Sequence, residues 1–294
     1  MTPTATAAAT THEAPVGTLG LLGRLLTARG RNRADLCYQF MGTRNCPATD
    51  CTYLNLGYWR DATGYRAAAE AMVDLLGDAA EIGAGDVVID AGCGFGDQDL
   101  RLAQTRAPGH IHAINVTDLQ IAHARAHNAH PAITYHLASA TALGFDAGSI
   151  DAVVSLEAAF HFDTREAFLR EAFRVLRPGG RLAVIDLIPL ERGGRVVRGG
   201  LRGAIERWAS QIPAANVYGA TGYRAILDAI GYDAPAIRSI SDDVVPPYLA
   251  YMRRVLSDPA EAQRFHPLIR QAMRHSSNPF ALSDYVLVTA RKPG

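Results

Sequence analysis

Three glycines at alternating positions end the stretch VVIDAGCGFG, and they restrict the fold more than any other feature of the chain. The apolar residues 87–89 have the β-branched density of a buried strand. Residues 97–105, after Gly92, Gly94 and Gly96, can form a helix. Glycine allows positive φ angles and lets the backbone approach a ligand closely. The segment therefore predicts a strand, a tight turn and a helix, with backbone N–H groups facing a ligand at the turn.

Strand and helix patterns alternate along the rest of the chain, which implies crossover connections and a parallel sheet. We expect a Rossmann-like α/β fold with seven mostly parallel strands and helices on both faces. An N-terminal helical extension and a lid insertion after the fifth strand complete this prediction. The expected strands are 87–91, 111–116, 133–137, 150–155, 181–187, 235–240 and the final DYVLVTAR, and the expected helices are 65–76, 97–105, 118–128, 164–176, 222–230 and a stretch within 243–275.

These patterns divide the chain into five segments. Residues 1–17 are rich in Thr and Ala and predict a disordered tail, and residues 18–61 predict a helical cap followed by a loop that covers the ligand. Residues 62–188 form the ligand-binding core, and residues 222–294 complete its sheet. Between them, residues 189–221 break the pattern with the Gly/Arg-rich text ERGGRVVRGG, which we interpret as a lid over the substrate. The alternative is a surface insertion that packs on the sheet edge and serves dimer contacts.

Composition restricts the partners. The 29 basic and 29 acidic residues balance to a net charge of zero, which disfavours nucleic acid because phosphate binding needs a basic face. No apolar run reaches the roughly 20 residues of a membrane helix, and no signal peptide is evident. His123 and His127 lie one helical turn apart without an acidic partner, so we predict no metal. We expect a cytoplasmic protein with a small-molecule substrate and neither nucleic-acid nor membrane partners; a homodimer is compatible with these features.

Two ligands compete for the glycine-rich turn. The dinucleotide pattern G-x-G-x-x-G would place its third glycine where this chain has Asp97, whose carboxylate would face a pyrophosphate. The pattern G-x-G-x-G preceded by Asp90 instead favours a smaller ligand without a diphosphate.

The stretch VVIDAGCGFG resembles the first motif of class I S-adenosylmethionine-dependent methyltransferases. ALGFDAGSIDAVVSLEAAFHF and FRVLRPGGRLAVIDL resemble the later motifs of that family in order and spacing, and the likeness covers about residues 53–187. The chain is similar in particular to bacterial enzymes that O-methylate sugars and polyketides. The resemblance implies S-adenosyl-L-methionine as cofactor and methyl transfer to a small-molecule secondary metabolite, as in antibiotic biosynthesis.

The resemblance also assigns cofactor-binding residues. Asp90 and the amides around Gly92, Gly94 and Gly96 would face the amino-acid end of the cofactor. Asn115 stands where the family usually has a carboxylate for the ribose, and an amide can still donate and accept hydrogen bonds. Near it, Gln120 would serve the cofactor, or would form a capping box with Thr117 for the next helix.

Further cofactor contacts come from three other positions. Ser139 and Ala140 take the place of the family's Asp-Ala beside the adenine, and Glu157 ends the fourth strand near the methionine part. LNLGYW resembles a segment that folds over the cofactor, where Tyr58 or Trp59 would lie near the sulfonium. The alternative for Trp59 is a place in the hydrophobic core.

Two residues at strand ends suggest the chemistry. His161 follows the fourth strand and Asp186 closes the fifth, so the pair can form a general-base dyad that takes a proton from a hydroxyl. Sugar O-methyltransferases of the family carry His and Asp at these motif positions. The alternative for His161 is a structural residue that caps the following helix. The predicted substrate contacts lie in the insertion and are Trp208, Ile212, Asn216 and Tyr218.

Other activities stay open at this point. Carbon or nitrogen methylation is one alternative, in which His161 would position the substrate. A homologue that binds the cofactor without catalysis is another, because Asn115 and Ser139 depart from the family pattern.

Overall fold

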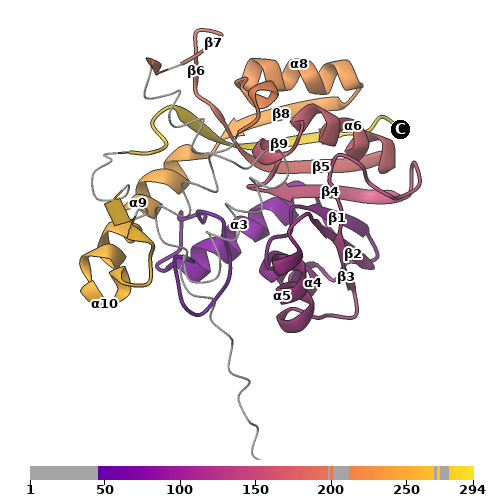
Figure 1. Ribbon diagram of the computed structural model, residues 1–294. Coiled ribbons are helices and arrows are strands. Elements are labelled where there is room, and N and C mark those ends of the chain that lie inside the picture. Colours follow the sequence, from indigo (N-terminus) through magenta and orange to yellow (C-terminus); the bar gives the residue numbers. More distant parts are fainter. Residues whose placement is uncertain (1–45, 198, 201–211, 268–269, 272–277) are drawn as a thin grey trace, which may run out of the picture.

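The computed structural model describes residues 46–197, 199–200, 212–267, 270–271 and 278–294 (Figure 1). The predicted tail and the helical pattern within residues 18–43 lie outside these ranges. In the described part of the chain, no helix has the length and apolarity needed to cross a membrane.

A single seven-stranded sheet forms the centre of the fold, in the order β3-β2-β1-β4-β5-β9-β8. The strands from β3 to β5 run parallel, and β9 pairs antiparallel with both β5 and β8. This arrangement confirms the predicted mostly parallel sheet. The bounds are β1 Val87–Ala91, β2 His110–Asn115, β3 Ile133–Leu137, β4 Ile150–Leu156, β5 Leu176–Pro189, β8 Asp233–Ser239 and β9 Ser283–Arg291.

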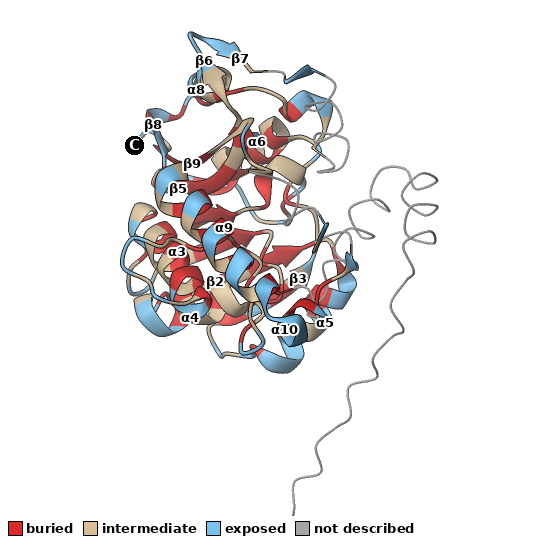
Figure 2. Cartoon of the chain, turned by 90° about the vertical axis from the view of Figure 1, so that its left-hand side faces the viewer, coloured by how far each residue is buried: buried red, intermediate tan, exposed pale blue. Residues whose placement is uncertain are grey.

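Helices cover both faces of the sheet, so the fold has three layers. Side chains alternate across each strand: Val154 packs with α3, α4, α5 and α9, while Val153 faces the core beneath α6 and α8. Figure 2 shows the central strands as the buried layer. The helices are α3 Tyr65–Ala79, α4 Asp97–Arg106, α5 Asp118–His127, α6 Arg165–Val175, α8 Ala220–Ile230, α9 Ser241–Ser257 and α10 Pro259–Ala262, with short 3₁₀ turns η2 Ala159–His161 and η3 Ala214–Asn216.

Two segments differ from the sequence prediction. The fifth strand was expected over 181–187, but β5 begins at Leu176 and includes the Pro-Gly-Gly text, and its register with β4 shifts between Ile150 and Ala152. Part of the Gly/Arg-rich text forms a hairpin of β6 (Glu191–Arg192) and β7 (Arg195–Val196). Its two loop residues, Gly193 and Gly194, both have positive φ, which a two-residue hairpin loop favours.

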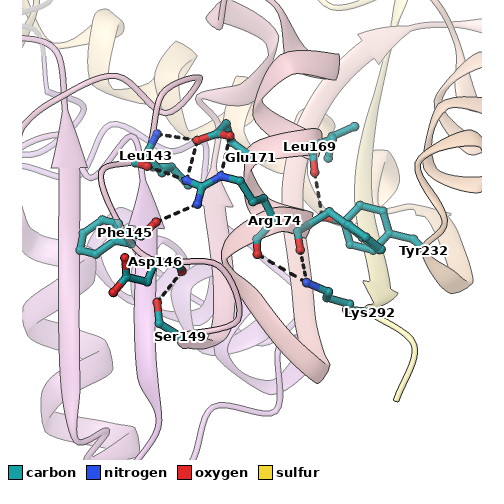
Figure 3. A network of polar contacts seen from close by, with 10 residues as sticks. Leu143, Phe145, Asp146, Ser149, Leu169, Glu171, Arg174, Tyr232 and Lys292 are labelled. Atoms are coloured by element: carbon teal, nitrogen blue, oxygen red, sulfur yellow. Dashed lines mark hydrogen bonds and ion pairs between the residues drawn. The ribbon is translucent and has the colours of Figure 1, made fainter.

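A polar network fixes the edge of the sheet where the parallel strands begin (Figure 3). Arg174, near the end of α6, donates to the carbonyl oxygens of Leu143 (2.7 Å) and Phe145 (2.8 Å) and pairs with Glu171. The ammonium of Lys292 donates to the carbonyl oxygen of Phe173 at 2.8 Å. Helix α6 runs antiparallel to β4 and β5, so its other end reaches the edge where those strands end.

Candidate functional site

The residues predicted to bind the cofactor gather at the edge where the parallel strands end. Asp90 lies in β1, Asn115 ends β2, and Glu157 follows β4. Asp186 lies near the end of β5. Ligands of open α/β sheets bind at this edge because neighbouring loops diverge there.

The three glycines of the turn have different roles. All have positive φ, at 92° for Gly92, 57° for Gly94 and 89° for Gly96. A Cβ on Gly92 would lie 2.3 Å from Cβ of Ala158, and one on Gly96 would lie 2.7 Å from the hydroxyl of Tyr135. Gly92 and Gly96 are therefore required by packing. Within the described part of the chain, a Cβ on Gly94 would meet only a methyl of Leu54, at 3.8 Å, so Gly94 borders open space there.

Two buried carboxyl groups lie beneath this turn. Asp90 and Asp99 have no exposed surface, and the side chain of Gln98 donates to Oδ2 of Asp90. Burial raises the pKa of Asp90 to about 6. Burial and the charge of Asp90 raise the pKa of Asp99 well above its ordinary value. The carboxyl groups of Asp90 and Asp99 are also hydrogen-bonded to each other. A contact of Asp90 with the ammonium group of an amino acid stays a prediction. Asp99 was not predicted, because in sequence it is one acidic residue of an amphipathic helix.

Asn115 and Gln120 are hydrogen-bonded to each other. Nδ2 of Asn115 donates to Oε1 of Gln120 at 2.7 Å, and Oδ1 of Asn115 accepts from the Val116 amide at 2.8 Å. Thr117 precedes α5 as its N-cap residue, but its side chain makes no capping hydrogen bond, so the capping-box alternative is wrong. Nε2 of Gln120 and Oγ1 of Thr117 are buried and have no hydrogen-bond partner among the described residues, and a ribose offers hydroxyls for such groups.

After β3, the Ser139 hydroxyl is hydrogen-bonded to that of Thr141 at 2.9 Å, and Ala140 is buried. This places the small pair beside the end of the sheet, next to Asn115 on β2. Its contact with an adenine stays a prediction.

The loop that contains LNLGYW is tied to the sheet edge. The backbone amide of Leu56 donates to Oε1 of Glu157 at 2.6 Å. Both the amide and the hydroxyl of Thr52 donate to the carboxylate of Asp97, at the start of α4. The residue that excluded a dinucleotide thus holds the covering loop against the glycine-rich turn.

Tyr58 and Trp59 are partly buried and contact α9. The hydroxyl of Tyr58 donates to Asp243 at 3.1 Å, and Nε1 of Trp59 donates to the carbonyl oxygen of Leu56 at 2.9 Å. The Trp59 ring lies 5.3 Å from that of Tyr251, and Trp59 packs against the core. A contact of either ring with a sulfonium stays a prediction.

Glu157 has an unusual electrostatic environment. It has a positive φ of 52°, and burial together with the nearby Asp186 raises its pKa from 4.5 to about 8. Between these pH values the folded protein holds a proton that the unfolded chain releases. Glu157 therefore costs stability progressively as pH rises from about 4.5 to 8, and nothing below that window.

We expect Glu157→Gln to remove this pH dependence. Relative to wild type, the ligand-free variant should gain on the order of a few kcal/mol more unfolding free energy at high pH than at low pH. Urea unfolding at two pH values, below 5 and above 8, measures the difference. An equal gain at both values would contradict the raised pKa of Glu157.

Asp186 forms a buried ion pair that the sequence did not reveal. Oδ2 of Asp186 lies 2.7 Å from Nε of Arg165, the first residue of α6, and both side chains are fully buried. Burial raises the pKa of Asp186, while Arg165 and the amides of Leu187 and Phe160 oppose the rise. Burial lowers the pKa of Arg165, but Asp186, Tyr223 and Tyr218 together outweigh burial, and the pKa of Arg165 is raised.

Replacing Asp186 by asparagine should destabilise the protein by about 3–5 kcal/mol, because the charge of Arg165 would stay buried without compensation. Urea unfolding measures this loss, with Glu166→Gln as the control. Glu166 pairs with Arg170 on the same helix, but these side chains are 45% and 56% exposed, so the control should lose at most about 1 kcal/mol. Equal small losses would show that Asp186 does not compensate Arg165.

The four predicted substrate residues differ in their surroundings. Trp208 lies outside the described residues, and Ile212 is partly buried. Asn216 is fully buried, and its side-chain amide is hydrogen-bonded to the chain itself rather than facing a ligand. The ring of Tyr218 lies 4.7 Å from the Arg165 guanidinium.

His161 ends the 3₁₀ turn η2, between β4 and α6, and is partly buried. Its ring lies 4.1 Å from that of Phe160. The N-cap of α6 is Thr164, whose hydroxyl accepts from the Ala167 amide at 3.1 Å. The alternative in which His161 caps this helix is therefore wrong.

The sheet order, the antiparallel β9 and the glycine-rich turn define a methyltransferase fold, and comparisons with known proteins agree. Residues 89–184 match a family model described as "Methyltransferase domain". Erythromycin 3''-O-methyltransferase of Saccharopolyspora erythraea is 33% identical over 90% of this chain and 92% of its own length. The 27-O-demethylrifamycin SV methyltransferase of Amycolatopsis mediterranei is 30% identical over 82% and 90%.

Among solved structures, the [4+2]-cyclase SpnF superposes with a TM-score of 0.71 at 22% identity, over 89% of this chain and 96% of that one, which shows the shared fold. The chain belongs to the S-adenosylmethionine-dependent methyltransferases.

Proposed function

We propose that the protein transfers a methyl group to a hydroxyl of a small natural product, such as a sugar or macrocycle of a glycosylated polyketide, with His161 as general base. The names of both similar proteins support O-methylation of antibiotics, and each likeness extends over most of the chain. The observation that carries the proposal is the place of His161. His161 ends the turn η2, and Ala158, the residue directly before η2, packs against Gly92 of the glycine-rich turn.

S-adenosylmethionine supplies a methyl group that is already activated by its sulfonium. The chain must therefore orient the acceptor hydroxyl, exclude water and remove one proton. In this proposal Asp90 and the Asn115–Gln120 pair hold the cofactor, and the loop around Leu56 covers it. The neutral ring of His161 accepts the hydroxyl proton as oxygen attacks the methyl carbon.

Asp186 is the second member of the proposed pair. Its contact with the Phe160 amide places it against the turn that carries His161, and the charge of its carboxylate is balanced by Arg165. We assign to Asp186 the support of this turn. The cytoplasmic location, the homodimer and the lid over residues 189–221 stay predictions.

A methyl-transfer assay with product identification tests the proposal. Isotopically methyl-labelled S-adenosylmethionine would be offered with glycosylated polyketides in matched pairs, one with a free sugar hydroxyl and one with that hydroxyl already methylated. We expect an O-methyl product, identified by NMR, from the free member only. Label on carbon or nitrogen would favour the alternative activities, and cofactor binding without transfer to any compound would favour a non-catalytic homologue.

A further inference from the structure

The side chain of Asn216 bridges the two residues that flank His161. Its Nδ2 donates to the carbonyl oxygens of Phe160 at 3.1 Å and Phe162 at 2.7 Å. Both N–H bonds of one primary amide are thus used on the turn η2, and Asn216 has no exposed surface. The polar groups of this turn are held by a residue from a distant segment of the chain.

Asn216 is itself fixed by Arg165. Oδ1 of Asn216 accepts from the Arg165 amide at 2.8 Å, and the guanidinium donates to the Asn216 carbonyl oxygen at 3.0 Å. The rings of Tyr218 and Tyr223 lie 4.7 and 5.1 Å from the guanidinium. Together with the ion pair to Asp186, these contacts hold the guanidinium of Arg165 in place.

Several other contacts hold parts of the connection between β4 and α6. The Glu157 amide donates to the carbonyl oxygen of Ile185 at 2.8 Å, and the Phe162 ring lies 5.0 Å from that of Phe168. The Thr164 cap orders the first turn of α6, and the Asp186 contact holds the Phe160 amide. The carbonyl groups on each side of His161 depend on Asn216. Loss of its two donors would leave these partly buried acceptors without their hydrogen bonds to Asn216, and the turn would shift to satisfy them.

We propose that Asn216 is a positioning residue for His161, and that the Arg165–Asp186 ion pair holds Asn216 in place. The inference rests on the proposed function, because it assigns Asn216 an effect on catalysis through the base. We therefore expect Asn216 to act on turnover more than on cofactor binding, because most of the assigned cofactor residues lie outside the connection between β4 and α6.

The test is a double-mutant cycle with Asn216→Asp and His161→Ala. Aspartate matches the size of asparagine but loses both donors. We expect Asn216→Asp to lower kcat by about 10–100-fold, with the KM of S-adenosylmethionine and the affinity for S-adenosylhomocysteine changed by less than about two-fold. In the His161→Ala background, single-turnover rates should show no further loss from Asn216→Asp, because the group that it positions is gone.

Two outcomes overturn the inference: wild-type kcat in folded Asn216→Asp, or the same fold-loss with and without His161. If His161→Ala alone keeps wild-type turnover, the proposed function fails instead, and that single variant reveals it. Should Asn216→Asp not fold, Asn216→Ser keeps one donor and runs in the same cycle.

A second experiment tests whether Arg165 holds Asn216 in place. It uses Arg165→Lys, with Arg174→Lys as the control. Lysine keeps the charge of Arg165 but cannot reproduce its several donors. We expect Arg165→Lys to lower kcat non-additively with His161→Ala. Arg174 also holds carbonyl groups, but at the opposite end of α6, so Arg174→Lys should lower the melting temperature alone. Equal effects of the two lysine variants on kcat would overturn the role of Arg165.

Discussion

Replacing His161 by alanine is expected to lower methyl transfer by about 10²–10⁴-fold, the usual loss when a general base is removed. The affinity for S-adenosylhomocysteine should stay within about two-fold of wild type, because in the proposed function the ring contacts the acceptor hydroxyl and not the cofactor. The backbone on each side of His161 accepts hydrogen bonds from the side chain of Asn216, which the substitution leaves in place. The path of the turn should therefore not change.

Single-turnover kinetics with saturating cofactor measures the chemical step, and calorimetry measures the affinity. His127→Ala is the matched control, since His127 is an exposed histidine on α5 whose ring stacks on His123. It should keep wild-type rates. Full turnover by His161→Ala on the compound that the wild-type protein methylates would contradict the general-base role of His161.

Gly94→Val should abolish binding of S-adenosylmethionine and S-adenosylhomocysteine. Gly94 is the turn glycine whose added side chain would enter open space, so valine would fill the volume next to Asp90 and Asn115. At a φ of 57° a β-branched residue is also strained. The steric block, rather than the strain, is the expected cause.

Gly148→Val separates these two causes. Gly148 has a φ of 72°, also faces open space, and precedes β4 at the other end of the sheet. It should show the strain alone, as a lower melting temperature with normal cofactor affinity by calorimetry. Normal affinity in Gly94→Val would mean that the cofactor does not pass this glycine, and NAD binding to wild type would contradict the interpretation of the turn.

The fold was largely predictable because its determinants are local. The β-branched residues 87–89 and the helical pattern of residues 65–76 are each visible within a short window, and alternation of such windows implies a parallel sheet. The strand ends followed from the same pattern. The pattern therefore places Asp90, Asn115 and Glu157 at one edge of the sheet.

The contacts that complete the site were not predictable, because they join distant segments. Arg165 looks in sequence like an exposed first-turn residue of α6, and only the fold brings Asp186 and Asn216 to it. The hydrogen bond between Thr52 and Asp97 likewise joins two segments that lie 45 residues apart in the sequence. Fully buried arginine and aspartate have no local signature, because their burial depends on the partner that neutralises them.

The position of β9 has a consequence for how the chain reaches its native state. β8 (Asp233–Ser239) pairs only with β9 (Ser283–Arg291), which lies between it and β5. During synthesis, β5 and β8 therefore emerge with unpaired edges and keep them until residue 291 has been made. Such edges are sites of association between nascent chains. The last strand to be made is thus an interior strand of the sheet. A truncation before β9 should therefore yield aggregates instead of a smaller folded domain.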